Sequence, residues 1–537
     1  MKGRSADAQA TFSRCNSHSL GAVRVRLKRL RSREYIFGLL IAISFATAPV
    51  LQFWVHNRTE LSTIRPVVNA VLIEALTATT LTTALVIWLQ RASHLVIGCV
   101  VGANGYLFFQ WQLFDSGPYW LQHAQWILTA VGVSFCVAVL ARRPAGKLFV
   151  VLSSTILFAV PGLSLLANPR QSQALDKTQR HTADPGSSGT ETKPNVYFIV
   201  TDGYGRADQL ERVLDYDDGP FIDDLGDRGF DVRTDSFSCY PATFLSIVSM
   251  LEMDHIAIES HDLDGGSAGF YRRLRGDNAA VEAFRERGYL YVHAESGSYA
   301  GTDCTRQYFD VCIEAGGVEG AFNLDESERA IAQLTPFSPL IDNGVLPVGE
   351  SFSDPQRVID ELWKDRPPSP YFAFVHVLAP HAPYRLDANC DVRGRSVGRI
   401  GKGWQPDMRD DYVASLNCLH QQLLVAVDKI VQDDPSAIIV ISGDHGSAFE
   451  MKWSADFANW SEDQIFERYA TFHAVRVPER CSASLSEPEA ANIVNALRIV
   501  IACVDRKDPI LLAPGAFFYS YSNKEIVELE GLEIFDR

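Results

Sequence analysis

Hydrophobic residues follow two different patterns along the chain. Between residues 35 and 166 they form five long apolar stretches, at residues 35–55, 67–89, 94–114, 120–140 and 148–166. Each stretch approaches the roughly 20 apolar residues that a helix needs to cross a bilayer. A cleaved signal peptide would show one short apolar core instead of a repeated pattern. The pattern therefore predicts an α-helical membrane domain of five transmembrane helices over residues 35–166.

The second half of the chain alternates short β-rich runs with helical stretches. The runs NVYFIVT, YLYVHA, YFAFVHVL and AIIVISG start at residues 195, 289, 371 and 437 and are almost entirely apolar, as in strands covered on both faces. Residues 281–288 and 411–431 have helical spacing. We expect residues 195–537 to form an α/β sandwich with a mostly parallel central sheet. Residues 167–194 are polar and aperiodic, and are expected to be a flexible linker.

The formal net charge of −16 is unevenly distributed. The first 34 residues contain nine Lys and Arg and two acids, so the rest of the chain is acidic. Because basic segments beside membrane helices stay in the cytoplasm, we expect residues 1–34 and the loop 141–147 to be cytoplasmic. Five crossings then predict a multi-pass protein of the cytoplasmic (inner) membrane with an extracytoplasmic, periplasmic C-terminal domain. The acidic domain has no basic stripe, which argues against nucleic acid as a substrate. The oligomeric state stays open.

Seven of the ten cysteines lie in the predicted exported half. An oxidising compartment would allow three disulfides and leave one cysteine over. Closeness in the sequence favours Cys304–Cys312, followed by Cys390–Cys418 and Cys481–Cys503, although other pairings of the seven remain open. The sequence has no C-x-x-C pair, which disfavours a zinc ribbon.

Four polar clusters fall where the strands of such a sheet should end. They are Asp202 in IVTDGYGR, Thr243 in YPATFLSIVSM, His376 and His381 in FVHVLAPHAPY, and Asp444 with His445 in IVISGDHGS. In a parallel sheet, catalytic and ligand-binding residues lie beyond the carboxyl ends of the strands. Carboxylate, hydroxyl and imidazole groups are ligands that a divalent cation takes at a phosphoryl- or sulfuryl-transfer site. The clusters therefore predict a metal-dependent enzyme tethered to the membrane.

Each cluster taken alone also has an ordinary structural explanation. An aspartate after a strand is commonly a turn residue, as Asp202 could be. A threonine before an apolar run, such as Thr243, is commonly a helix N-cap. His376 lies inside an apolar run and could be a buried core histidine. Only the four clusters together, in this order, favour a metal site.

The order of these motifs resembles the alkaline phosphatase and sulfatase superfamily. The shared order is a strand followed by Asp-Gly, a threonine that opens a helix, two histidines in H-x-x-x-x-H-x-P, and a strand followed by Gly-Asp-His-Gly. Five membrane spans before an external catalytic domain look like the branch that contains lipoteichoic acid synthase and the phosphoethanolamine transferases. The resemblance covers residues 195–478 by motif and the membrane half by architecture. It implies an alkaline-phosphatase-like fold.

The resemblance also implies roles for the matching residues. Thr243 would be the nucleophile, because TFLSIVSM is similar to the T-x-x-S-x-x-x-M pattern around the modified threonine of the transferases. Asp202, Asp444 and His445 would complete a metal site with Thr243. Because imidazole is among the ligands, zinc or manganese is a better candidate cofactor than calcium or magnesium.

Three further residues are expected to contact the substrate. His381 matches a histidine that holds the transferred group or a second ion, and His376 would do the same or orient its neighbour. Arg468 is the candidate anion-binding group, because a further histidine expected soon after the Gly-Asp-His-Gly motif comes only at His473. A structural ion pair is the alternative role for Arg468.

One departure from the transferase pattern affects the expected substrate, and a comparison with sulfatases bears on the nucleophile. Asp202 stands where the transferases usually have glutamate, which is closer to the phosphodiesterases and phosphomutases. Sulfatases use a cysteine in C-x-P-S-R, whereas Cys239-Tyr-Pro-Ala-Thr243 lacks the serine and the arginine. We therefore favour Thr243 over Cys239 as the nucleophile.

The predicted function is that of a metal-dependent phosphoryl-group transferase. It would act on head groups of membrane lipids or envelope glycans through a covalent intermediate on Thr243. One alternative is a phosphodiesterase or sulfatase-type hydrolase of the same fold, which differs only in the molecule that enters the second step. The other is a non-catalytic membrane protein with a degenerate domain.

Overall fold

The chain, seen as a computed structural model, divides into two compact units. One comprises Met1–Gln179 with Ser327–Pro339, and the other Arg180–Glu326 with Leu340–Arg537. The structure describes residues 33–57, 65–89, 93–108, 119–167, 193–256, 267–297, 302–304, 308–318, 322–323, 328, 331–332, 335–336, 348–397, 404–451, 459–520, 525–531 and 535. Most of the predicted cytoplasmic N-terminus (1–34) and linker (167–194) lies outside these residues. The bounds of the four predicted segments stay predictions.

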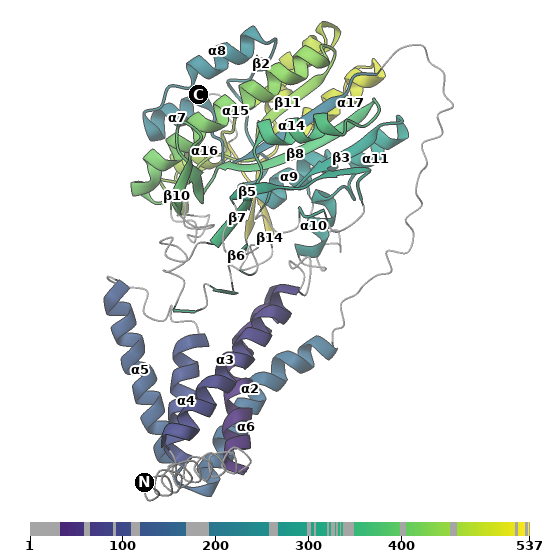
Figure 1. The fold of residues 1–537 in the computed structure, drawn as a ribbon. Coiled ribbons are helices and arrows are strands. Elements are labelled where there is room, and N and C mark those ends of the chain that lie inside the picture. The colour runs from purple at the N-terminus through teal and green to yellow at the C-terminus, as the bar shows by residue number, and fades with distance from the viewer. Residues whose placement is uncertain are drawn as a thin grey trace, which may run out of the picture. The chain divides into compact units, whose positions relative to one another are not determined.

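The first unit consists of apolar helices (Figure 1). They are α2 (Arg33–Asn57), α3 (Arg65–Leu89), α4 (Ser93–Phe108), α5 (Tyr119–Leu140) and α6 (Pro144–Ala167). In the part of the chain that the structure describes, four of these helices, and not the expected five, are long and apolar enough to cross a membrane. The exception is α4, whose 16 residues span about 24 Å, less than the ~30 Å hydrocarbon core. Residues 109–114 of that expected span lie outside the described residues.

The second unit is built around a seven-stranded sheet (Figure 1). Its strands are β2 (Asp231–Val232), β12 (His473–Arg476), β11 (Ile438–Gly443), β1 (Val196–Asp202), β8 (Tyr371–Pro380), β3 (Leu290–Ala294) and β4 (Val311–Ile313), in this order across the sheet. The strands from β11 to β4 are parallel, and β12 and β2 extend the β11 edge in antiparallel pairing. The predicted mostly parallel sheet is therefore confirmed, and the four apolar runs form β1, β3, β8 and β11.

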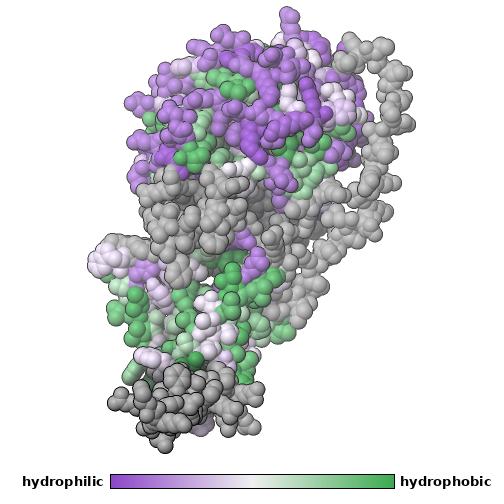
Figure 2. All heavy atoms as spheres, in the orientation of Figure 1, coloured by the Kyte–Doolittle hydropathy of each residue, from purple (hydrophilic) through white to green (hydrophobic). Residues whose placement is uncertain are grey.

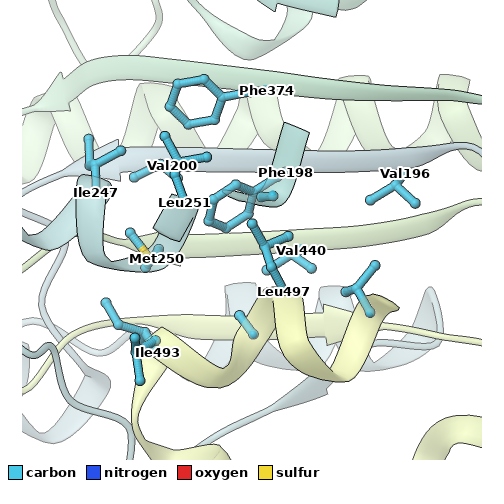
Figure 3. Packing of buried hydrophobic residues seen from close by; sticks show 14 of the residues in the cluster. Val196, Phe198, Val200, Ile247, Met250, Leu251, Phe374, Val440, Ile493 and Leu497 are labelled. Atoms are coloured by element: carbon cyan, nitrogen blue, oxygen red, sulfur yellow. The ribbon is translucent and has the colours of Figure 1, made fainter. Parts of the chain in front are cut away.

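Helices cover both faces of this sheet, and each face has its own apolar core. One face packs on α9 (Thr243–Glu252), α11 (Ala279–Glu286) and α17 (Ala496–Asp505). Figure 3 shows Phe198 and Val200 of β1 in this core, with Leu251 of α9 and Leu497 of α17. The other face packs on α7 (Ala207–Leu214), α8 (Gly219–Asp227), α14 (Pro355–Lys364) and α15 (Arg409–Asp433). Alternate residues of β1 enter opposite cores, which explains why the whole run is apolar.

The remaining elements complete the unit, and some of them add residues to the first core. They are α10 (Ser267–Leu274), α16 (Glu462–Tyr469), the 3-10 helices η3 (Pro406–Met408), η5 (Glu479–Ser486), η6 (Pro488–Ala491) and η7 (Ile493–Asn495), and three small sheets made of β5 (Gly316–Val318), β6 (Phe322–Asn323) and β7 (Val348–Phe352), of β9 (Tyr384–Leu386) and β10 (Val392–Val397), and of β13 (Phe517–Ser520) and β14 (Glu525–Glu528). Figure 2 shows mostly hydrophilic atoms on the visible face of the second unit and mostly hydrophobic atoms on the helices of the first.

Three disulfides join cysteines of the second unit. They are Cys304–Cys312, Cys390–Cys418 and Cys481–Cys503. These are the three pairs that closeness in the sequence favours. Cys239 is the cysteine left over, and its side chain is buried. Disulfides of this kind persist in oxidising compartments, which agrees with the predicted export of this unit.

Candidate active site

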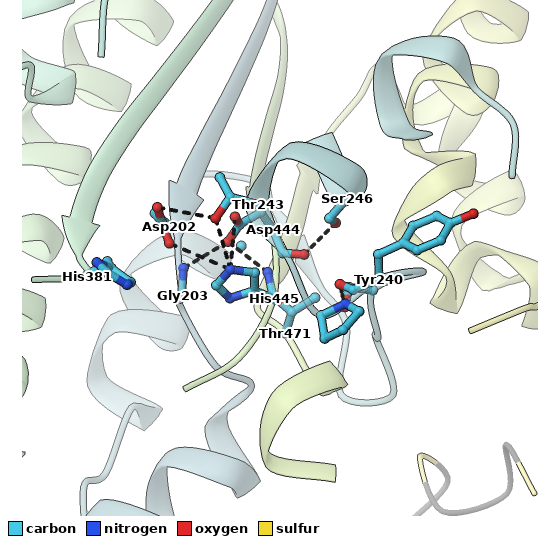
Figure 4. Close-up of polar contacts among 12 residues, drawn as sticks. Asp202, Gly203, Tyr240, Thr243, Ser246, His381, Asp444, His445 and Thr471 are labelled. Carbon is cyan, nitrogen blue, oxygen red and sulfur yellow. Dashed lines mark hydrogen bonds and ion pairs between the residues drawn. The ribbon is translucent and has the colours of Figure 1, made fainter. Parts of the chain in front are cut away.

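The site lies at the carboxyl edge of the sheet, where β1 and β11 end side by side. Thr201 of β1 pairs with Gly443 of β11, so Asp202 and Asp444 leave the sheet at the same level. One oxygen of Asp444, Oδ1, accepts hydrogen bonds from the backbone N–H groups of Gly203 and His445, each at 2.8 Å. These bonds fix the carboxylate between the two loops (Figure 4).

Thr243 reaches this edge from α9, which packs on the sheet from one side. Its hydroxyl lies 3.1 Å from His445 Nε2 and 3.5 Å from Asp202 Oδ2 (Figure 4). Thr243 is the first residue of the helix, and the N-cap position is occupied by Ala242 without a side-chain cap. The N-cap explanation of Thr243 is therefore wrong. Its side chain is half-buried, and its hydroxyl contacts the polar side chains of His445 and Asp202.

His445 is held in one tautomer by the backbone. Its Nδ1 lies 3.0 Å from the carbonyl oxygen of Gly446, which can only accept, so Nδ1 carries the proton. Nε2 is then an acceptor, and it faces the Thr243 hydroxyl and a guanidinium nitrogen of Arg468 at 3.0 Å. Burial lowers the pKa of His445 well below its ordinary value, so the ring is neutral. A neutral imidazole with a directed Nε2 lone pair suits metal binding or proton transfer.

Arg468 joins the two loops that carry Thr243 and His445. Its guanidinium donates to the carbonyl oxygens of Pro241 at 2.7 Å and Gly446 at 2.8 Å. Burial lowers the pKa of Arg468 to about 10, so the group remains cationic at neutral pH. The structure thus places this predicted anion-binding residue at the site, where its guanidinium donates hydrogen bonds to backbone carbonyl groups of the two loops.

The two carboxylates provide an observation that favours a cation. Asp202 Oδ1 and Asp444 Oδ2 are buried, and neither makes a hydrogen bond with any residue that the structure describes. Burial raises the pKa of Asp202 to about 7, and burial together with the Asp202 charge raises the pKa of Asp444 well above its ordinary value. Two buried carboxylates at one point are costly unless a positive charge joins them.

The distances around His445 Nε2 suit a small divalent ion. This nitrogen lies 3.1 Å from Thr243 Oγ1, 3.4 Å from Asp444 Oδ2 and 3.7 Å from Asp202 Oδ1. Ligands about 2.0–2.2 Å from a tetrahedral zinc ion are separated by roughly 3.3–3.6 Å. The four predicted metal ligands are therefore brought together, and the residues fit the cation that their chemistry implies.

The two histidines of the third cluster occupy different positions. His376 is inside β8, opposite Val200, and not at the end of the strand where it was expected. Its ring forms a buried cluster with Asp202 and Asp444, in which the potential ligand atoms lie within 4.8 Å of one another. His381 follows β8 directly and is half-buried, and its Nδ1 contacts the carbonyl oxygen of Ala382 at 2.5 Å. Figure 4 shows His381 beside the cluster without a drawn contact to it.

Sequence reasoning missed two residues near the site. Trp404 packs edge to face against His381, with ring centroids 4.9 Å apart, and its indole would be 2.8 Å from a Cβ placed at Gly203. Glu467 is buried beside Arg468 and accepts hydrogen bonds from Ser447 and the backbone of Phe449, both at 2.6 Å. Neither residue lies in a motif, although the adjacency of Glu467 to Arg468 was a weak signal.

Cys239 is far less suited to catalysis than Thr243. Its Sγ lies 3.0 Å from Asn492 Oδ1 and 3.6 Å from His255 Nδ1, and its side chain is fully buried in the core under α9. Burial raises the pKa of the thiol to about 12, which suppresses the thiolate at neutral pH.

Comparison with solved structures found several proteins that are similar to this chain. Solved structures similar to this chain include the C-terminal periplasmic domain of EcEptC from Escherichia coli, with a TM-score of 0.41 and 10% identity over 63% of this chain and 93% of that chain. The putative sulfatase yidJ from Bacteroides fragilis has a TM-score of 0.38 and 12% identity over 64% and 84%. The phosphonate monoester hydrolase of Agrobacterium radiobacter has a TM-score of 0.33 and 14% identity over 61% and 80%.

No curated protein gave a significant match to the sequence. The model of the sulfatase family matches residues 194–465, a range that contains Asp202, Thr243, both histidines of the third cluster, Asp444 and His445. This match covers half of the chain, from the start of β1 into α16. The chain therefore belongs to the sulfatase family, within the alkaline phosphatase and sulfatase superfamily, and is a sulfatase-like enzyme.

Proposed function

We propose that this protein is a metal-dependent phosphoryl-group transferase that uses Thr243 as a covalent nucleophile. The observation that carries the proposal is the position of the Thr243 hydroxyl. It is half-buried at the first turn of α9, within 3.5 Å of a buried imidazole and a buried carboxylate. The positive end of the helix dipole favours negative charge at this oxygen. A threonine with only a structural role would not need two buried ionisable side chains beside its hydroxyl.

The chain's own residues support two balanced steps. In the first, Thr243 Oγ1 forms a bond to phosphorus, its proton leaves to solvent, and the bond from phosphorus to the donor lipid oxygen breaks. The donor oxygen takes up a proton. In the second, an acceptor hydroxyl forms a bond to the same phosphorus and loses its proton, the bond from phosphorus to Thr243 Oγ1 breaks, and Oγ1 takes up a proton. Arg468, close to the developing negative charge, would stabilise both transition states.

Asp202, Thr243, Asp444 and His445 are the residues that would hold the cation. When bound, a divalent ion would lower the pKa of the nucleophile and neutralise charge on the transferred group. Mixed oxygen and nitrogen ligands suit zinc or manganese. His381, with Trp404 beside it, would contact the transferred group.

The membrane unit supports a substrate that is anchored in, or lies near, a bilayer. Four helices long and apolar enough to span would keep the catalytic unit at a membrane surface. Lipid or glycan head groups of the cell envelope are presented there, outside the cytoplasm if the basic loops set the orientation. Water in place of the acceptor hydroxyl would make the same site a phosphodiesterase or a sulfatase-type hydrolase.

The proposal is tested by the mass of the protein itself. Full-length protein purified from its native membrane should carry a mass increment that peptide analysis assigns to Thr243, and the increment identifies the transferred group. A Thr243→Ala variant should lack it. An increment on Cys239, or conversion of Cys239 to an aldehyde, would overturn the assignment in favour of a sulfatase that uses formylglycine.

A further inference from the structure

His376 occupies an unusual place for a histidine with a purely structural role. It lies within β8, opposite the residue of β1 that comes two positions before Asp202. Its side chain is almost fully buried, and a ring nitrogen lies within 4.8 Å of carboxylate oxygens of Asp202 and Asp444. The oxygens Asp202 Oδ1 and Asp444 Oδ2 receive no hydrogen bond from the described residues.

The order of the strands gives His376 its own direction of approach. β1 lies between β11 and β8, so Asp202 leaves the sheet between the other two strands. His445 follows β11, whereas His376 belongs to β8. The imidazole of His445 therefore approaches the two carboxylates from the β11 side of β1, and the imidazole of His376 approaches them from the β8 side. The two rings occupy different positions around the carboxylates.

A serine from a third strand orients the His376 ring. Ser296 lies just after β3, which pairs with β8 on the side away from β1. Its hydroxyl is buried, 2.8 Å from His376 Nδ1. An imidazole bonded through Nδ1 presents Nε2 on the other edge of the ring, as in metal sites where a second partner fixes the tautomer of the ligand.

His293 shows how a core histidine of the same sheet differs. It is equally buried, on β3, with Nδ1 3.2 Å from Tyr291 Oη and Nε2 2.8 Å from the carbonyl oxygen of Thr302. Both of its nitrogens contact uncharged protein groups. His376 instead has a hydroxyl on Nδ1 and a ring nitrogen within 4.8 Å of two buried carboxylates, which is the environment of a ligand.

We propose that His376 is a ligand of the divalent cation held by Asp202 and Asp444, and that Ser296 is its positioning residue. The inference rests on the proposed function only in taking a bound cation from it. His376 would thus bind the metal and not the substrate. The cation would be linked to β3 and β8 as well as to β1 and β11.

The test measures metal binding and not activity. Full-length protein in detergent is stripped of metal, and its affinity for Zn²⁺ is determined by competition with a chromogenic chelator. The background from other sites is taken from an Asp202→Asn, Asp444→Asn double variant. We expect Ser296→Ala to weaken Zn²⁺ binding by about 10- to 100-fold, and His376→Ala to weaken it further. The matched control His293→Gln should bind like the wild type.

Two more readouts separate loss of a ligand from loss of folding. With Co²⁺ in place of Zn²⁺, the visible absorption bands should change in His376→Ala and stay unchanged in His293→Gln. The rise in Tm that saturating Zn²⁺ gives the wild type should shrink in His376→Ala, whatever the Tm of the metal-free variant.

The outcomes also distinguish this inference from the proposed function. Wild-type affinity and an unchanged Co²⁺ spectrum in His376→Ala would overturn the role of His376 and leave the function intact. A wild-type protein that binds neither Zn²⁺ nor Co²⁺ above the double-variant background would overturn the metal dependence of the proposed function and this inference together.

Discussion

Single side chains at the site are distinguished by the atoms that they contact. Thr243 and Cys239 are four residues apart, yet one hydroxyl faces His445 and Asp202 while the thiol faces Asn492 in the core. Thr243→Ala should therefore reduce turnover by roughly 10⁴-fold or more and abolish the covalent intermediate. Because Ala242 and not Thr243 is the N-cap, Tm should change little. Steady-state kinetics, intact mass and thermal unfolding check these expectations.

Two conservative variants serve as controls. Thr243→Ser keeps a hydroxyl at the same position and should retain measurable turnover. Cys239→Ser keeps a small polar group beside Asn492 and should leave most of the activity. Activity that survives Thr243→Ala but is lost in Cys239→Ser would contradict the assignment of the nucleophile.

Asp218 is a buried acid whose ionisation should affect stability. It accepts a hydrogen bond from Tyr204 at 2.9 Å, and burial raises its pKa from an ordinary 3.8 to about 7. Because the folded state holds this proton more tightly than the unfolded state, the stabilisation is complete below about pH 4 and is lost as pH rises through 7.

The variant Asp218→Asn does not titrate and isolates this effect. Its Tm relative to the wild type should increase between pH 4.5 and pH 8, by an amount equivalent to roughly 2–4 kcal/mol at most. Thermal unfolding of both proteins across this range makes the comparison. A Tm difference that is constant with pH, or that falls as pH rises, would show that Asp218 is ionised in the folded protein at low pH.

At the scale of elements, α16 holds the loop that follows β11. A Cβ placed at Gly446 would be 2.1 Å from the carbonyl oxygen of Glu467 and 2.8 Å from that of Ala470, both of which are backbone atoms. Gly446→Ala should therefore push the loop away from α16 and displace Asp444 and His445. A displacement on the order of 1 Å at a catalytic group costs about 100-fold in rate. We expect a loss of that size in kcat/KM, accompanied by weaker Zn²⁺ binding.

Gly226 provides a matched control for this substitution. It is an exposed glycine in α8, and a Cβ placed there meets no atom within 4 Å. Gly226→Ala should keep full activity and raise stability slightly, since alanine is favoured over glycine in a helix by roughly 0.5–1 kcal/mol. Equal activity of the two variants would mean that the close approach of α16 does not position the catalytic loop.

The orientation of the whole molecule in the membrane follows from its basic loops. Arg142 and Arg143 lie between α5 and α6, Lys147 lies near the start of α6, and basic residues of this kind remain cytoplasmic. A reporter fused after Leu166 should be active only outside the cytoplasm, and one inserted within residues 141–147 only inside. Paired alkaline phosphatase and fluorescent protein fusions report both compartments.

Because α4 is short, the same experiment also determines how many helices cross the membrane. If only the four long helices cross, an even number of spans separates residues 1–34 from the second unit. The Leu166 and 141–147 fusions depend on α6 alone, whereas a fusion at the N-terminus depends on every helix. A cytoplasmic Leu166 fusion would reverse the orientation and remove the compartment that the three disulfides require.

The sequence alone determined the features that depend on local patterns. Continuous apolar runs identified β1, β3, β8 and β11, because a strand covered on both faces must be apolar at every position. Helical spacing identified α11 and α15. The same polar residues that interrupt these runs, at Asp202 and Asp444, identified the carboxyl edge of the sheet. Short separations in the chain identified the three disulfides.

The tertiary structure decided what depends on contacts between distant segments. Only the packing of α9 on the sheet brings the Thr243 hydroxyl to His445, which comes 202 residues later in the chain. The N-cap position of α9 is occupied by Ala242 instead. Only the strand order puts His376 between the strand that ends at Asp202 and the strand that precedes Ser296. Only the return of α16 brings Glu467 and Arg468 to the loop after β11. The local sequence indicates which secondary structure each segment forms but not which segments pack beside it. These contacts between distant residues were therefore decided by the fold.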